Sequence, residues 1–178
     1  MLTFPIDISA NWHQNFAELS SLQSQWLLET GSLTAKLKMH FSNFKVQVLS
    51  EKNMMLTPEQ ASVMGIEIQE VLCREVILIA GNQARVYAQS WIPLASLNRD
   101  SEFLNLGDKP LGEFIFQHPN LERDNLMVAS VTPGKNLTAL FEQFNLNHEN
   151  CLARRSIFQL NGLRLMVCEA FLPGAIGS

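Results

Sequence analysis

The sequence is poor in charged residues and has no excess of basic ones. Charged side chains make up 17% of its 178 residues, below the average of about 25% in globular proteins. Thirteen lysines and arginines stand against seventeen aspartates and glutamates, and the formal net charge is −4. Proteins that bind nucleic acid present a basic stripe, so we expect no nucleic-acid partner. The hydrophobic share of 47% predicts instead one domain with a sizeable core, spanning residues 1–178.

Long apolar runs and a signal peptide are also missing. No run approaches the roughly 20 apolar residues of a membrane helix, and residues 1–10 have neither a basic region nor a long apolar stretch. The three cysteines, Cys73, Cys151 and Cys168, are odd in number and have no metal-ligand spacing. Free thiols fit a reducing compartment. We therefore expect a cytoplasmic protein without a membrane partner.

The sequence signatures of common cofactor and metal enzymes are absent. There is no phosphate-binding loop, no dinucleotide-binding glycine motif and no nucleophile elbow. The four histidines, which share no metal-ligand spacing, are His13, His40, His118 and His148. We expect neither a metal nor a cofactor.

The apolar pattern predicts helices and antiparallel strands. Helices are expected at residues 15–30, 33–41, 58–64, 111–117 and 137–144. Strands are expected at residues 44–49, 66–80, 86–93, 126–131, 156–160 and 163–172. Caps are expected at Ser32 and Thr57, and hairpin turns at residues 81–82 and 161–162. Hairpins with helices outside them, and no strand–helix–strand alternation, indicate an α+β fold with an antiparallel sheet.

Two charged residues fall in apolar rows of the expected strands. Strand alternation places Arg74 on one face among aliphatic side chains, and it places Glu169 in an apolar row of the last strand. A buried unpaired charge would be strongly destabilising. The two residues therefore form a buried structural ion pair, or they line a cavity and contact different ends of a polar ligand. Both interpretations are open at this point.

The ligand interpretation has a definite chemistry. A guanidinium group binds a carboxylate through two parallel hydrogen bonds. A carboxyl group among apolar side chains can exchange a proton with a hydroxyl group or a carbon acid. A cavity that holds Arg74 and Glu169 would suit a small ring with a carboxylate at one end and a hydroxyl at the other.

Several short motifs occur in the order and spacing of one known family. They are residues 72–78 (LCREVIL) with the returning strand to Pro93, residues 110–112 (PLG), and residues 154–156 (RRS) before a hairpin ending at residues 169–173 (EAFLP). Over residues 15–173 the chain resembles the chorismate lyases. The resemblance implies a six-stranded antiparallel sheet with helices packed around it and an enclosed ligand pocket.

The resemblance also implies an activity and a substrate. Chorismate lyases eliminate pyruvate from chorismate without a cofactor and release 4-hydroxybenzoate, which would feed ubiquinone or plastoquinone biosynthesis. The chain looks most like the photosynthetic branch of the family, and a plastid-encoded member would work in the plastid stroma. Chorismate would be its only partner, and we expect a monomer.

Site residues follow from the resemblance by position. Arg74 matches the arginine that holds the ring carboxylate, and Glu169 matches the glutamate near the 4-hydroxyl group; these two are the expected catalytic residues. Leu111 and Leu33 match positions whose backbone contacts the ligand, although bacterial relatives carry methionine at the second. A further arginine should meet the enolpyruvyl carboxylate, and the candidates are Arg155 and Arg123.

Two other interpretations compete with the lyase. A similar fold forms the effector-binding domain of a class of bacterial transcription regulators, so the chain could be a binding or sensor domain for an aromatic carboxylate. Residues 1–43 are too few and too poor in basic residues for the DNA-binding domain of such regulators. The second alternative is a structural protein in which Arg74 and Glu169 form a buried salt bridge.

Overall fold

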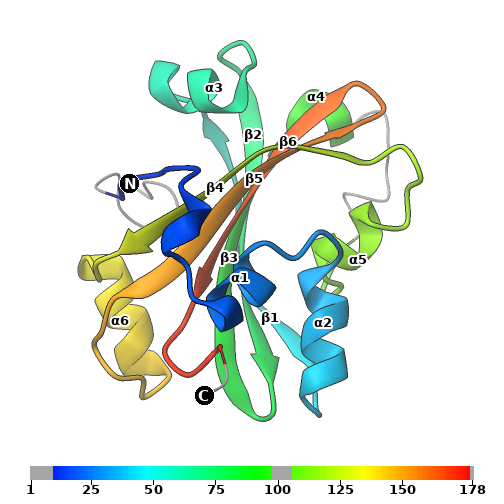
Figure 1. Cartoon of the computed structure of the whole chain (residues 1–178). Coiled ribbons are helices and arrows are strands. Elements are labelled where there is room, and N and C mark those ends of the chain that lie inside the picture. Colours follow the sequence, from blue (N-terminus) through cyan, green and yellow to red (C-terminus); the bar gives the residue numbers. More distant parts are fainter. Residues whose placement is uncertain (1–9, 98–105, 177–178) are drawn as a thin grey trace.

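The computed structural model describes residues 10–97 and 106–176 (Figure 1). Residues 1–9, which were expected not to form a signal peptide, lie outside the described residues. The helices are η1 (Phe16–Glu18, a 3₁₀ turn), α1 (Ser21–Leu27), α2 (Leu33–His40), α3 (Pro58–Met64), α4 (Leu94–Leu97), α5 (Leu111–Ile115) and α6 (Lys135–Gln143). The strands are β1 (Lys45–Met55), β2 (Glu70–Ala80), β3 (Gln83–Pro93), β4 (Glu122–Val131), β5 (Cys151–Leu160) and β6 (Leu163–Phe171).

The strands form one six-stranded antiparallel sheet in the order β1-β2-β3-β6-β5-β4. Two hairpins, β2–β3 and β5–β6, supply its four central strands. All four turn residues, at positions 81–82 and 161–162, have positive φ angles between 51° and 80°. Asn-Gly and Gly-Asn pairs tolerate this backbone, which matches the twist of the flanking strands. The expected sheet and both hairpin turns are confirmed.

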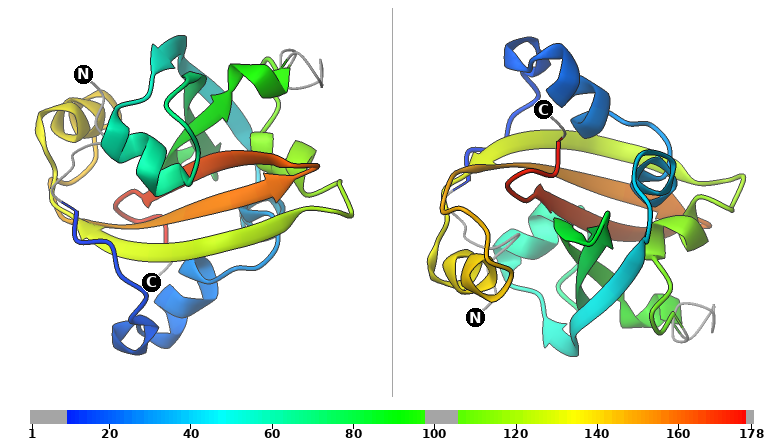
Figure 2. Two further views of the ribbon diagram at one scale, coloured as in Figure 1. Left: turned by 90° about the horizontal axis from the view of Figure 1, so that it is seen from above. Right: turned by 90° about the horizontal axis from the view of Figure 1, so that it is seen from below.

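Helices cover both faces of the sheet (Figure 2). Apolar side chains of α1, α2 and α5 pack on one face, and those of α3 and α6 pack on the other. We call the first the α2 face and the second the α6 face. Because both faces are covered, alternate residues of the central strands are buried on opposite sides. The α+β class is confirmed.

The helix expected at residues 15–30 is wrong in its extent. The chain forms the 3₁₀ turn at Phe16–Glu18, extends at Leu19 and restarts as α1 at Ser21. The Ser20 hydroxyl accepts a hydrogen bond from the Gln23 amide at 3.2 Å, and the Gln23 side chain accepts one from the Ser20 amide at 2.9 Å. This capping box starts a new helix within the apolar stripe, so local capping overrides the periodicity.

The first strand is longer than the expected residues 44–49 and contains a β-bulge. The pairing of β1 with β2 shifts between Val48 and Ser50, so Ser50 lies opposite Glu75 and Glu51 lies opposite Arg74. A bulge sets two residues against one on the partner strand and changes which face the later side chains occupy. Glu51 therefore lies on the α2 face with Arg74.

The expected cap of α3 is confirmed and gives a stability test. The Gln60 amide donates to the Thr57 hydroxyl at 3.2 Å, and the Thr57 amide donates to the Gln60 side chain at 2.8 Å. Thr57→Ala is expected to lower the free energy of unfolding by about 1 kcal/mol, because an orphan helix amide loses its acceptor. Urea unfolding measures the loss. Thr57→Ser keeps the hydroxyl and should stay near wild type; an equal loss in both variants would contradict the capping role.

The cysteines lie in the core as free thiols. All three are buried, and burial raises the pKa of Cys73 and Cys151 to about 12. Within residues 10–97 and 106–176, no group of three or more histidine, cysteine, aspartate or glutamate side chains could hold a metal ion. No helix in the described part of the chain has the length and apolar character needed to cross a membrane.

Candidate active site

A cavity lies between the α2 face of the sheet and the helices α2 and α5. Most of its lining is aliphatic or aromatic, and its charged members are Arg74, Arg123, Arg154 and Glu169. Leu33 and Leu111 also line it. Its free volume is about 40 Å³, far below the roughly 300–1,000 Å³ of typical small-molecule pockets. The expected charged pair therefore shares one cavity, but residues 10–97 and 106–176 form no enclosed pocket of ligand size there.

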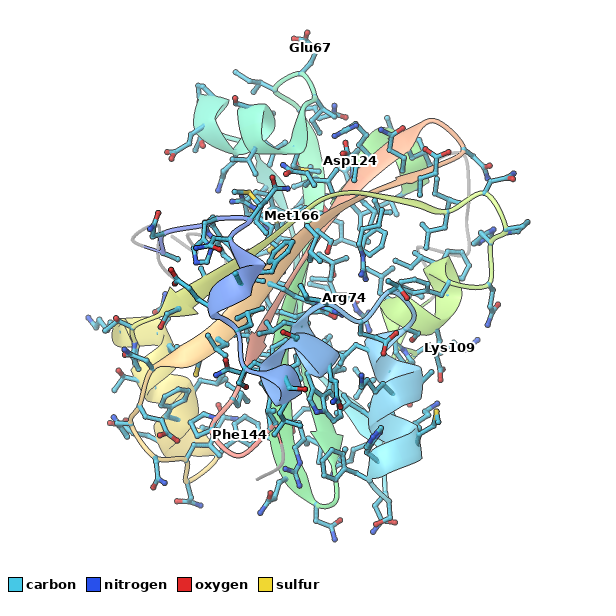
Figure 3. All side chains as sticks on the ribbon, in the orientation of Figure 1. Glu67, Arg74, Lys109, Asp124, Phe144 and Met166 are labelled. Carbon is cyan, nitrogen blue, oxygen red and sulfur yellow. The ribbon has the colours of Figure 1, made fainter. Side chains whose placement is uncertain are left out.

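Arg74 is held from two sides at the centre of β2 (Figure 3). Its side chain is only 2% exposed, and its Nη1 forms an ion pair with Glu51. Its Nη2 donates to the carbonyl oxygens of Gly107 at 2.8 Å and Lys109 at 3.1 Å. The edge strand and the segment before α5 thus fix the guanidinium group, so its position depends little on its own flexible chain.

Glu169 is paired with Arg154 and not with Arg74. The two residues lie directly opposite each other on β6 and β5, and Arg154 Nε donates to Glu169 Oε2. The Arg154 side chain is 1% exposed, and its Nη1 donates to the carbonyls of Leu27 at 3.2 Å and Glu29 at 3.3 Å. A buried Arg74–Glu169 salt bridge, the structural alternative, is therefore wrong.

The expectation for Arg155 requires a correction. Arg155 lies opposite Cys168, so strand alternation directs it to the α6 face, away from the cavity. Its guanidinium group lies 4.8 Å from the centre of the Trp12 ring. Arg154, which was not singled out from the sequence, occupies the cavity in its place. The two-residue turn at 161–162 carried the signal, because such a turn sets Arg154 opposite Glu169.

Arg123, the other candidate arginine, does line the cavity. Its guanidinium group lies 4.9 Å from the centre of the Phe158 ring, and Nη1 donates to the Glu29 carbonyl. Its Nε is buried and has no hydrogen-bond partner among the described residues. Burial, reinforced by the positive charge of Arg154, lowers the pKa of Arg123 to about 10. An unused donor on a partly desolvated cation is suited to bind an anion.

The sequence profile described as Chorismate lyase matches residues 8–176 of the chain. The chain belongs to the chorismate lyase family. A relative named probable chorismate pyruvate-lyase, from Pseudoalteromonas translucida, is 42% identical over 98% of each chain. One of the same name from Shewanella frigidimarina is 33% identical over 98% of this chain and 94% of its own. The resemblance inferred from the motifs is confirmed.

Solved structures with the same architecture include regulator domains. The effector domain of PhnF from Mycobacterium smegmatis superposes with a TM-score of 0.59 at 14% identity, covering 81% of this chain and 90% of its own. A GntR-family transcriptional regulator from Bacillus cereus gives 0.57 at 14% identity, covering 77% and 96%. At such low identity the likeness shows the fold alone, and this chorismate lyase family member shares it.

The two residues expected to contact a ligand through their backbone begin helices. Leu33 is the first residue of α2 after its cap Ser32, and Leu111 is the first residue of α5 after Pro110. The amide N–H of a first helical residue has no acceptor within its own helix. Both residues line the cavity.

The charges of the cavity favour an anionic ligand. Three guanidinium groups and one carboxylate line it, and Glu51, outside the lining, pairs with Arg74, so one positive charge remains in excess. Arg74 and Glu169 are separated by β3 and by two residues along the strands, which places their backbones on the order of 10 Å apart. Their head groups can therefore hold opposite ends of one substituted ring.

Proposed function

We propose that the protein is a chorismate lyase that eliminates pyruvate from chorismate and releases 4-hydroxybenzoate, without a metal or a cofactor. The observation that carries the proposal is the cavity in which Arg74, Arg123, Arg154 and Glu169 meet among apolar side chains. Chorismate carries two carboxylates and one hydroxyl group, which complement this set. Membership of the chorismate lyase family supports the same substrate.

Each polar group of the substrate has an assigned partner. Arg74 and the Leu111 amide bind the ring carboxylate. Glu169 and the Leu33 amide bind the 4-hydroxyl group, and Arg154 keeps the Glu169 carboxylate in place. The enolpyruvyl carboxylate binds Arg123, whose Nε is unused.

The elimination makes the ring aromatic, so it is favourable by itself and needs few catalytic groups from the protein. The C3–O bond to the enolpyruvyl group breaks, the hydrogen at C4 leaves, and the C3–C4 double bond completes the ring. The enolpyruvyl methylene gains a proton and departs as pyruvate. Arg74 and Arg123 orient and desolvate the substrate, while Glu169 orients the hydroxyl and assists the proton transfer.

Substrate entry requires the cavity to widen. Its free volume of about 40 Å³ is too small for a substituted ring, since small-molecule pockets have roughly 300–1,000 Å³. The α2 and α5 helices cover the cavity, and the exposed Lys38–Glu113 ion pair links them. Such a pair contributes little stability, so α2 and α5 can separate to admit chorismate into an enclosed pocket.

The proposal is tested by mixing the purified protein with chorismate alone. Equimolar 4-hydroxybenzoate and pyruvate, separated by chromatography and lost in Arg74→Ala and Glu169→Ala, are the expected result. Saturable binding of 4-hydroxybenzoate without turnover would favour a sensor, as in the regulator domains that share the fold. If the protein shows no turnover and no binding, the proposed site is wrong.

The role of Arg123 predicts different effects on substrate and product. Arg123→Gln is expected to raise KM for chorismate by about 10- to 100-fold, because a charge-assisted contact to the enolpyruvyl carboxylate is lost. The dissociation constant of 4-hydroxybenzoate should stay near wild type, because the product lacks that carboxylate. Steady-state kinetics and calorimetry measure the two quantities. Equal weakening of both would place Arg123 elsewhere in the site.

We also propose how the protein works in its cell. In this proposal it is a monomer with a single domain over residues 1–178. Three buried free thiols support a reducing compartment, the cytoplasm or a plastid stroma. The product would enter ubiquinone or plastoquinone synthesis.

A further inference from the structure

The β-bulge in β1 places a carboxylate where a regular strand would place a hydroxyl group. Val48 lies opposite Val76 before the bulge, so unbroken antiparallel pairing would set Ser50 opposite Arg74. The bulge inserts one residue, and Glu51 lies opposite Arg74 instead. The ion pair between them thus depends on a local irregularity of the sheet.

Glu51 already pairs with the guanidinium group to which the ring carboxylate of the substrate would bind. The two hydrogens of Nη2 are directed to the carbonyls of Gly107 and Lys109, and Nη1 binds Glu51. An incoming ring carboxylate therefore meets a guanidinium group whose charge an internal carboxylate already neutralises. It gains the full charge-assisted interaction only by displacing Glu51, because otherwise two carboxylates would share one guanidinium group.

The partners of Arg74 differ in how easily they can leave. The Arg74 side chain is 2% exposed and Glu51 is 42% exposed, on the edge strand β1. Glu51 can rotate into water and recover its hydration, whereas the Lys109 carbonyl belongs to a turn closed by a 2.7 Å bond from its amide to Leu106. Glu51 is therefore the group that gives way.

We propose that Glu51 is a displaceable internal anion: it neutralises Arg74 in the empty protein, and the ring carboxylate of the ligand takes its place on Nη1. The inference rests on the proposed function, since it assumes a carboxylate ligand on Arg74. Without Glu51 the empty cavity would hold a buried cation lacking a charged partner, which destabilises the fold. Glu51 therefore stabilises the empty protein and weakens ligand binding.

The experiment measures binding of 4-hydroxybenzoate by calorimetry and unfolding without ligand. Glu51→Gln is expected to bind roughly 5- to 20-fold more tightly, because the ligand no longer displaces a carboxylate, and to unfold at a lower temperature. KM for chorismate should fall in parallel. Glu51→Asp keeps the charge on a shorter side chain, so its ligand affinity should lie between those of wild type and Glu51→Gln. It provides a second variant if Glu51→Gln does not fold.

Asp124→Asn is the matched control. Asp124 pairs with Arg164, is 49% exposed, and its removal changes the net charge equally; its ligand affinity should stay at wild type. If Glu51→Gln binds the ligand more weakly than wild type, Glu51 orients Arg74 for binding. If Glu51→Gln and Asp124→Asn bind the ligand equally well, any change comes from the net charge of the protein. Either result overturns the inference. If Glu51→Gln binds the ligand more tightly but neither wild type nor any variant turns over chorismate, the inference is supported and the proposed lyase activity is wrong. Absence of binding in every variant overturns both.

Discussion

Replacing Glu169 with glutamine is expected to lower kcat for chorismate by about 100- to 10,000-fold, the range seen when a group that assists proton transfer is lost. Glutamine has the same shape and can still accept the hydrogen bond that Arg154 Nε donates to Glu169. The fold should therefore persist while the negative charge near the 4-hydroxyl group disappears. The absorbance of released 4-hydroxybenzoate measures kcat, and thermal unfolding reports the fold.

Glu75 provides the matched control for this loss. It is also a buried carboxylate, it accepts a 2.5 Å hydrogen bond from the Tyr87 hydroxyl, and it lies on the α6 face, away from the cavity. Glu75→Gln is expected to keep kcat near wild type. A loss as large as that of Glu169→Gln would show that any buried carboxylate in the sheet matters equally, and it would remove the special role of Glu169.

Replacing Arg154 with methionine is expected to lower the free energy of unfolding by about 3–5 kcal/mol, because it leaves the Glu169 carboxylate, which is only 13% exposed, without its cation. The variant also removes the donor that Arg154 supplies to the carbonyls of Leu27 and Glu29, where α1 ends. Urea unfolding measures the change. Arg164→Met breaks the more exposed pair with Asp124 and should cost no more than about 1 kcal/mol.

A double variant separates the contribution of the Arg154–Glu169 pair to stability from its contribution to catalysis. Arg154→Met with Glu169→Leu removes both charges, so most of the lost stability should return, while turnover should remain absent. A single Arg154→Met variant as stable as wild type would show that Glu169 has another counter-ion. Recovery of turnover in the double variant would mean that the pair serves stability alone.

The regular part of the fold could be predicted from the sequence because its determinants are local. Gly81-Asn82 and Asn161-Gly162 require turns with positive φ, and alternating apolar residues define the strands that they join. Thr57 with Gln60 determines the start of α3. The same local chemistry explains the main error at residues 15–30, where the Ser20 cap outweighs an apolar stripe.

The two charged residues of the proposed site could also be predicted from strand alternation, and a third residue of the cavity could have been. Arg74 and Glu169 stand out because a charge in an apolar row is costly unless it has a partner or a ligand. Arg154 follows from the two-residue turn, which fixes the register of β5 against β6. Arg155 was preferred although alternation directs it to the α6 face.

By itself the sequence determined the two hairpins, their turns and the faces on which Arg74 and Glu169 lie, since each depends on neighbours within one hairpin. Only the tertiary structure decided that Glu51 is the partner of Arg74, because a bulge in β1 shifts the pairing of two strands separated by α3. It also decided that Arg123 joins the cavity from the far edge strand. The apolar pattern says which side of a strand is buried, but the groups that meet there depend on how distant elements pack.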